Sequence, residues 1–141
     1  MTNFLTDEEE ALLVTAIRTQ ESRTSAEIRV CVSNKLIFFP ERYAWRMFEK
    51  IGMRNTRQRN GTLIVMIPRR KKIVILGDSG FDAVVTADFW NEAVSAMVKQ
   101  MHAQGPLEAL KEGLQRLGDQ LAVHWPQQAD DVNELPDEIL R

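Results

Sequence analysis

The sequence is poor in the residues that form disulfides and histidine-based metal sites. It has a single cysteine, Cys31, among 141 residues, which excludes an internal disulfide. Its only histidines are His102 and His124, so a metal site built mainly from imidazole ligands is not expected. Cys31 lies inside a strand-like run, and we expect a buried thiol there rather than a reactive nucleophile.

Long hydrophobic runs are missing as well. No apolar stretch approaches the roughly 20 residues of a membrane helix. The first residues include Thr6-Asp7-Glu8-Glu9-Glu10, where a secretory leader would be basic and then apolar. We therefore expect a cytoplasmic protein without membrane insertion. The net charge of -2 gives no overall attraction to nucleic acid or to anionic membranes.

Two β-branched runs in the middle of the chain organise the fold. The first, residues 62–67, has no polar alternation, which is typical of a central strand covered on both faces. A short polar turn follows, and the second run, residues 72–76, ends in Gly77-Asp78-Ser79-Gly80. The pattern predicts a buried antiparallel hairpin whose last loop is the first place to look for function.

A third strand is expected over residues 27–33, with one face less buried because it is less apolar. A helix over 41–55 would connect it to strand 62–67, and such crossovers between parallel strands are right-handed. These strand directions bring several polar and glycine positions to one rim of the sheet: Glu27, Asn60, Gly61 and residues 77–82.

Further helices are expected over 5–20, with a capping box of Thr6 and Glu9, over 88–103, and from Pro106 onward. Thr86 or Asp88 is the expected N-cap of the second of these. The elements together predict an α/β fold, a three-layer α/β/α sandwich around a small mixed sheet, as a single domain over residues 1–126. Residues 127–141 are acidic and are expected to form a flexible tail, which could dock as a short linear motif.

Two surface features have more than one interpretation. Leu36-Ile37-Phe38-Phe39 either folds back onto the core or forms an exposed contact surface. A basic stripe recurs every four residues in the helix over 41–55 and is either a solvated face or a docking site for an acidic partner or a phosphate backbone. Its members are Arg42, Arg46, Lys50 and Arg54. No recognisable nucleic-acid motif accompanies the stripe.

The glycine loop carries the candidate chemistry. Glycines allow close backbone approach, so carboxylates and carbonyls can converge on a cation, and hard oxygen ligands suit Ca²⁺ or Mg²⁺. The candidate metal ligands are Glu27, Asp78, Asp82 and Asp88, and Asp78 is the candidate catalytic base or nucleophile. The residues that could complete a cofactor site are Asn60, Gly61, Gly77, Ser79 and Gly80. Alternatively, the loop is simply a turn in which Asp78 or Ser79 bonds its own backbone.

Several of these stretches together resemble the TPM domain family, which includes the plant thylakoid-lumen photosystem II repair protein. The matching pieces are Ser25-Ala26-Glu27-Ile28-Arg29-Val30, Arg59-Asn60-Gly61-Thr62-Leu63-Ile64, the loop Gly77-Asp78-Ser79-Gly80-Phe81, Ala44 and Phe48, and the closing helix with Leu114 and Leu121. The resemblance implies an α/β/α sandwich, a divalent-cation site near the glycine loop, and the phosphatase label that the family carries. Many relatives are tethered by a membrane helix, a feature not found in this sequence.

Three functions follow as hypotheses. The first is a cytoplasmic TPM-domain binding or accessory protein that acts with a protein partner, including one associated with a membrane. The second is a metal-dependent, acid-phosphatase-like hydrolase that uses Asp78, although no recognisable phosphatase signature is present. The third is an anion-binding module that uses the basic helix 41–55. Composition and motifs leave the substrate and the partner open.

Overall fold

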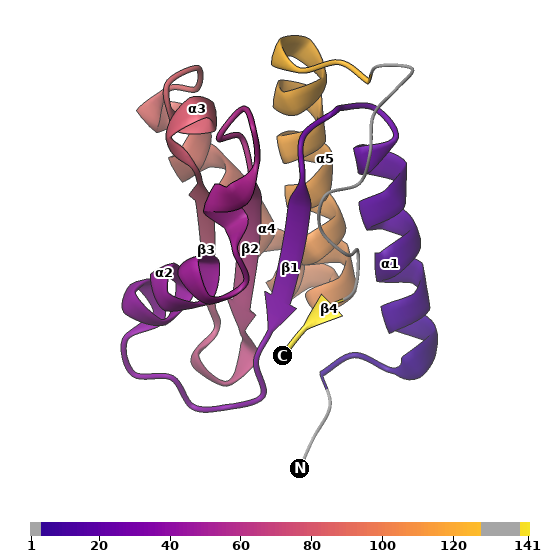
Figure 1. Ribbon diagram of the computed structural model, residues 1–141. Helices are drawn as coiled ribbons and strands as arrows, with labels where there is room; N and C mark the ends of the chain where they lie inside the picture. The colour runs from indigo at the N-terminus through magenta and orange to yellow at the C-terminus, as the bar shows by residue number, and fades with distance from the viewer. Residues whose placement is uncertain (1–3, 128–138) are drawn as a thin grey trace.

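A four-stranded mixed sheet forms the centre of the computed structural model, which describes residues 4–127 and 139–141. Its strands are β1 (Ile28–Val32), β2 (Thr62–Ile67), β3 (Lys72–Gly77) and β4 (Ile139–Leu140), in the order β3-β2-β1-β4. β1 runs parallel to β2 and to β4, while β3 returns antiparallel to β2 (Figure 1). The predicted hairpin and the predicted parallel crossover are therefore both confirmed.

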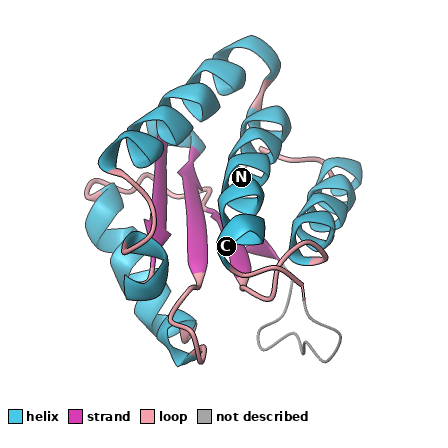
Figure 2. Ribbon diagram, turned by 90° about the horizontal axis from the view of Figure 1, so that it is seen from above, coloured by secondary structure: helices cyan, strands magenta, loops and turns pink. Residues whose placement is uncertain are grey.

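Helices cover both faces of this sheet (Figures 1 and 2). α1 (Asp7–Glu21), α4 (Ala87–Gln104) and α5 (Pro106–His124) pack on one face, and α2 (Pro40–Lys50) with the short 3₁₀ helix η1 (Met53–Asn55) packs on the other. Two further short helices occur at strand ends: η2 (Pro68–Arg70) and α3 (Ser79–Asp82). This is the predicted α/β/α sandwich.

The side chains of β2 point alternately into the two halves of the core. Ile64 and Met66 belong to the larger cluster, under α1, α4 and α5. Leu63, Val65 and Ile67 belong to the smaller cluster, under α2. Every residue of β2 is buried, as the unbroken apolar run predicts.

Two expectations are wrong, and the structure decides between the two interpretations of residues 36–39. β1 is buried on both faces, not on one, because strands and helices enclose it completely. The helix predicted over 41–55 ends at Lys50, because Gly52 takes a left-handed conformation (φ 76°) and a separate 3₁₀ turn follows. In the stretch 36–39, only Ile37 packs against the core, whereas Leu36, Phe38 and Phe39 are exposed.

The helix caps match the sequence pattern. Thr6 and Glu9 form both hydrogen bonds of a capping box at the start of α1. Of the two candidates for the N-cap of α4, it is Thr86 whose hydroxyl accepts a hydrogen bond from the Phe89 N–H, at 3.2 Å. Asp88 instead occupies the first turn of α4, where a negative charge is favourable. Cys31 is completely buried, and this burial raises the pKa of its thiol.

The expected acidic tail falls mostly on residues 128–138, which lie outside the described residues. Ile139 and Leu140 belong to the sheet rather than to a free tail, because they pair with Val30 and Cys31 of β1 as strand β4. The side chain of Arg141 forms a salt bridge with Glu10 of α1. Across the described parts of the chain, none of the helices is both long and apolar enough to span a bilayer.

Candidate functional site

The rim predicted from strand directions forms at the ends of β1, β2 and β3. The Thr62 N–H donates to the Glu27 carbonyl at 3.0 Å, and the Asp78 N–H donates to the Gly61 carbonyl at 2.9 Å. The Gly80 N–H donates to the Arg59 carbonyl at 2.8 Å. These backbone hydrogen bonds join the three segments, and they place Asp78 beside the loop that enters β2.

Gly80 allows this loop and the start of α3 to touch. A Cβ atom built on it would contact the Gln58 carbonyl oxygen and would lie 2.7 Å from the Arg59 carbonyl oxygen. Neither of these oxygens can move without the backbone that carries it. The glycine is therefore needed here for close packing of two chain segments. Asn60 and Gly61 are buried in the same place, and Ser79 is exposed.

The carboxylate of Asp78 is buried and fully engaged. Asp78 is only 1% exposed. Arg59 donates hydrogen bonds to both carboxylate oxygens, from Nε to Oδ2 at 2.6 Å and from Nη2 to Oδ1 at 2.9 Å. Arg54 Nη1 reaches Oδ1 at 3.2 Å, and the Ser79 N–H donates to the same oxygen at 2.8 Å. Two guanidinium groups and a backbone amide thus surround one carboxylate.

These partners decide the charge state of Asp78. Burial by itself acts to raise the pKa of the carboxyl, but the hydrogen bonds from Arg59 and the Ser79 amide, with the charges of Arg59 and Arg54, outweigh it. The pKa of Asp78 is consequently lowered. The same hydrogen bonds raise the pKa of Arg59. Asp78 is therefore an anion, and both of its carboxylate oxygens are already engaged by Arg59, with Arg54 and the Ser79 amide on Oδ1.

Of the other predicted metal ligands, only Asp82 lines the same hollow as Asp78 among the described residues. Asp82 accepts a hydrogen bond from the Trp90 indole N–H at 3.2 Å, Asp88 is exposed on α4, and Glu27 is buried at the entry to β1. Among the described residues, no three acidic, histidine or cysteine side chains are grouped so that they could hold a metal. A divalent cation on Asp78 would also have to displace Arg59 against its positive charge. The Ca²⁺ or Mg²⁺ site therefore stays a prediction, which an ion titration tests.

We expect millimolar Ca²⁺ or Mg²⁺ to leave the amide NMR signals of residues 77–82 unchanged, because both arginines already neutralise Asp78. An Arg54→Met and Arg59→Met double variant, which frees the carboxylate, serves as the comparison. Shifts in the unaltered protein that are confined to residues 77–82, Glu27 and Asn60 would contradict this expectation and support the metal site.

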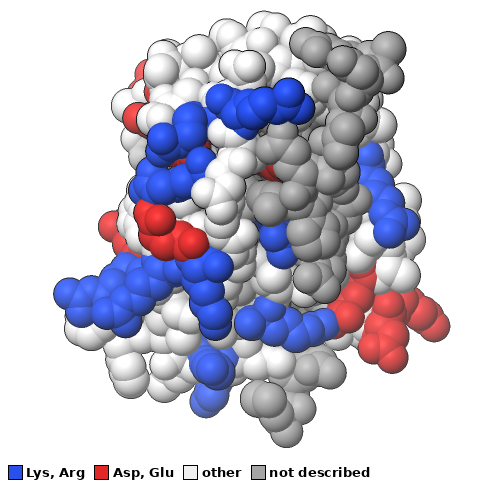
Figure 3. All heavy atoms as spheres, viewed as in Figure 1, with Lys and Arg blue, Asp and Glu red and all other residues white. Residues whose placement is uncertain are grey.

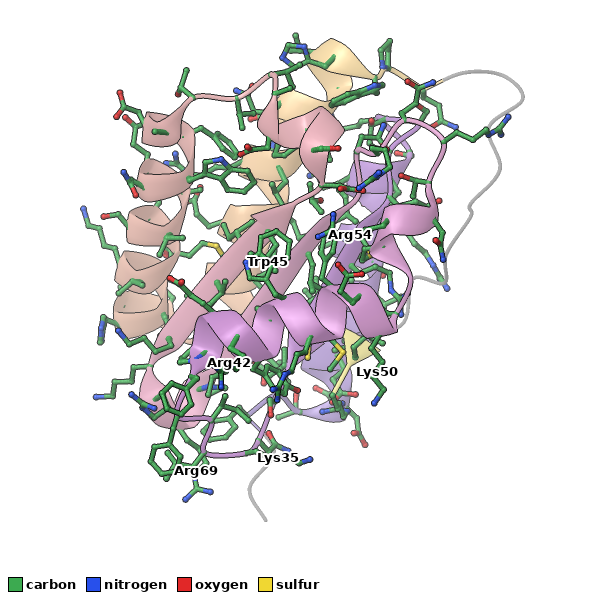
Figure 4. All side chains as sticks on the ribbon, turned by 60° about the vertical axis from the view of Figure 1, so that its left-hand side comes forward. Lys35, Arg42, Trp45, Lys50, Arg54 and Arg69 are labelled. Carbon is green, nitrogen blue, oxygen red and sulfur yellow. The ribbon has the colours of Figure 1, made fainter. Side chains whose placement is uncertain are left out.

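An open hollow of about 350 Å³ lies next to the Asp78 cluster. Trp45 of α2 and Arg54 line it on one side, Trp90 of α4 lines it on the other, and the edge strand β3 passes between them. The Arg54 guanidinium lies 5.7 Å from the ring centre of Trp45, and Figure 4 shows these two side chains next to each other above α2. Ser79 and Asp82 complete the wall.

Sequence reasoning found Asp78 but missed Trp45 and Arg59, and it placed Arg54 in the basic stripe rather than beside Asp78. Trp45 interrupts the basic outer side of α2, and an exposed tryptophan between arginines was the available signal. Arg59 gave no such signal, because its role depends on a positive φ of 52°, which is uncommon for a non-glycine residue.

Comparisons with known proteins agree on one family. The sequence profile of the TPM domain matches residues 1–120. The NMR structure of BA42 protein from the psychrophilic bacterium Bizionia argentinensis is 36% identical, with a TM-score of 0.90, and the match covers 99% of this chain and 97% of that chain. The comparison with curated proteins gave no match.

More distant structures share the fold alone. The N-terminal domain of a P. gingivalis protein is 16% identical with a TM-score of 0.73, over 89% of this chain and 83% of that chain. The N-terminal domain of the cg2496 protein from Corynebacterium glutamicum is 11% identical with a TM-score of 0.51, over 97% of this chain and 80% of that chain.

Proposed function

The chain belongs to the TPM domain family, and we propose that this member is an accessory binding module that holds a segment of a partner protein at the rim and performs no reaction at Asp78. The hollow between Trp45, Arg54 and Trp90 is the observation that carries the proposal. Tryptophan and arginine are the residue types most enriched at binding hot spots. Here Trp45 and Arg54 lie on one side of the edge strand, and Trp90 lies on the other.

The edge strand defines what the hollow would hold. β3 is the outermost strand, and among the described residues no other strand pairs with its outer side. Extended peptides bind such edges by adding a strand, with main-chain hydrogen bonds for affinity and side-chain pockets for specificity. The occupant that fits is an extended segment that bonds to the backbone of residues 75–77 and places a large apolar side chain between Trp45 and Trp90.

The rival functions receive less support. A hydrolase that uses Asp78 needs a free carboxylate, and Arg59 and Arg54 occupy this one. The proposed anion-binding stripe does not include Arg54, because Arg54 lies in η1 and forms salt bridges with Glu49 and Asp78. The stripe on α2 itself keeps three exposed cations, Arg42, Arg46 and Lys50, of which Arg42 lines a separate hollow at the opposite end of the sheet.

A library of random peptides displayed on phage tests the proposal while the partner is still unidentified. Panning on the intact protein should enrich peptides with a large apolar residue in an extended sequence. These peptides, once synthesised, should shift the amide signals of residues 75–79 and the indole signals of Trp45 and Trp90. Trp45→Ala should weaken the binding of these peptides about tenfold or more, since truncating a hot-spot side chain costs about 2 kcal/mol.

The matched control is Val123→Ala, which shortens an exposed apolar side chain on α5 that does not line the hollow. It should leave peptide binding unchanged. Peptides that shift residues elsewhere, or that bind Trp45→Ala as well as the unaltered protein, would refute the rim as the binding site. A lack of enrichment over an uncoated surface would argue against a peptide-binding module.

A further inference from the structure

The loop between β1 and α2 presents apolar side chains to solvent at the end of the sheet opposite the rim. Phe38 is 69% exposed and Phe39 is 68% exposed, and Leu36 is exposed beside them. In Figure 1 this loop forms the lower left end of the molecule, below α2. Two adjacent, largely exposed phenylalanines on one loop are unusual for a surface with no ligand.

The turn between β2 and β3 lies against this loop and brings positive charge to it. Arg70 Nη1 donates a hydrogen bond to the Ile37 carbonyl at 2.8 Å, and its guanidinium lies 5.8 Å from the ring centre of Phe38. The Arg42 guanidinium lies 5.6 Å from the ring centre of Phe39. The cations of this end, which we call the basic collar, are Lys35, Arg42, Arg69, Arg70, Lys71 and Lys72.

The basic collar forms no ion pair with the described part of the chain. Within the described residues, Glu41 is the acidic residue that shares a hollow with it, together with Arg42 and Lys72. Figure 4 shows Lys35, Arg42 and Arg69 together at the lower end, on the other side of α2 from Trp45 and Arg54. The acidic first turn of α1 lies toward the lower right in Figure 3, across the same end of the molecule from the cations at the lower left, and the net charge of -2 sums over both groups.

We propose that this end docks peripherally on a bilayer that contains anionic lipids. Phe38 and Phe39 enter the interface between headgroups and acyl chains, and the basic collar binds the lipid phosphate groups around them. Both parts of the arrangement match that surface, because aromatic and apolar side chains add burial while clustered lysines and arginines add attraction to anionic headgroups. The chain lies on the membrane in this position and does not cross it.

A bilayer fits this end better than an acidic peptide does. The phenylalanines stand on a protruding loop with the cations around them, so a flat, deformable and negatively charged surface meets both at once. An acidic peptide would pair with the cations and leave the aromatic rings in water. The hollow of about 460 Å³ between Phe38, Arg42 and Lys72 is open, which leaves room for a headgroup beside the rings.

Vesicle sedimentation with the full chain tests the proposal. The probes are vesicles of phosphatidylcholine alone and vesicles of phosphatidylcholine with phosphatidylglycerol. The protein should sediment with the anionic vesicles only, and added salt should release it. Phe38→Ser with Phe39→Ser, and separately Arg69→Glu with Lys71→Glu, should each lower the partition coefficient about tenfold or more.

The matched controls make the same kinds of substitution outside the basic end. Val123→Ser replaces an exposed apolar residue on α5, and Lys99→Glu reverses an exposed charge on α4. Both should bind the anionic vesicles as the unaltered protein does. All altered residues are exposed, and a native far-ultraviolet circular dichroism spectrum checks that each variant is folded.

Three results would overturn the proposal. Equal sedimentation with both kinds of vesicle would remove the role of anionic lipid, and no sedimentation with either would remove the bilayer. Unchanged vesicle binding after the phenylalanine substitutions would mean that the protein binds the vesicles only through non-specific charge attraction. Beads that carry polyglutamate identify the alternative: capture on them without vesicle binding would assign the basic end to an acidic protein partner instead.

Discussion

Asp78→Asn is expected to destabilise the protein by about 2–3 kcal/mol at neutral pH, because it removes a buried charge that two arginines surround. The asparagine keeps the size of the side chain and can still accept from the Ser79 amide. It loses the charge-assisted bonds from Arg59 and Arg54, which are 2.6–3.2 Å long. Both guanidinium groups are partly exposed and can take up water, which keeps the loss below that of a fully buried pair. Urea unfolding of the two proteins measures the difference.

The same pair of proteins should respond differently to acid. The pKa of Asp78 is lower in the folded protein than in the unfolded chain, where an aspartate titrates near about 4. Its contribution to stability is therefore complete above about pH 4 and is lost as the pH falls toward the folded pKa. The unaltered protein should lose stability steeply there, whereas Asp78→Asn should lose less, so the two unfolding free energies converge.

Ser79→Ala is the control, because Ser79 is the exposed neighbour whose backbone amide, not its side chain, binds Asp78. It should unfold within about 0.5 kcal/mol of the unaltered protein at every pH, as expected for a surface position. If Asp78→Asn were equally neutral, or if its deficit persisted undiminished in acid, the structural role of this carboxylate would be refuted.

Gly80→Ala should lower the free energy of unfolding by about 3 kcal/mol or prevent folding, because the added methyl group would clash with the backbone. The group would contact the Gln58 carbonyl oxygen and would approach that of Arg59 to 2.7 Å. Overpacking against backbone is costly because the neighbour cannot rotate away. Thermal unfolding followed by circular dichroism measures the loss, and amide signals of residues 58–62 report whether the rim has shifted.

Gly105→Ala separates this steric effect from backbone strain. Nothing lies within 4 Å of a Cβ atom at Gly105, but its φ of 98° is unfavourable for alanine. We expect a loss of only about 1–2 kcal/mol there, since strain acts without a clash. A Gly80→Ala protein as stable as Gly105→Ala would mean that the two rim segments are not in close contact.

The sequence was sufficient to predict the sheet around β2, because an apolar run, a short turn and a crossover helix leave few topologies. It also placed Asp78 beside Asn60 and Gly61, since strand direction alone decides which loops meet. It did not predict what binds the carboxylate. Arg59 reaches Asp78 from an uncommon backbone conformation that no local pattern encodes.

Burial was harder to predict than topology. β1 carries Arg29 and Glu27 within or beside it, which suggested an exposed face, yet both residues are buried. The converse holds for Phe38 and Phe39, whose apolar character favoured a place in the core but which lie in solvent. Both results depend on neighbours from distant parts of the chain, and hydrophobicity alone does not identify them.

The rim and the basic end lie at opposite ends of the sheet, so the two proposed contacts do not compete. A partner segment along β3 would leave the Phe38–Phe39 loop free, and a protein docked by that loop would still present Trp45 and Trp90. The module would then hold its partner next to a membrane surface. Each contact has its own variants, Trp45→Ala for one and the phenylalanine pair for the other, so each can fail independently.

We propose that Asp78 is an anchored anion and not a metal ligand or a catalytic group. Its carboxyl ¹³C chemical shift, followed by NMR as the pH is lowered, measures this directly. We predict a pKa below the usual aspartate range that does not change when millimolar Mg²⁺ or Ca²⁺ is added. A pKa at or above that range, or one that falls as the cation concentration rises, would contradict the claim.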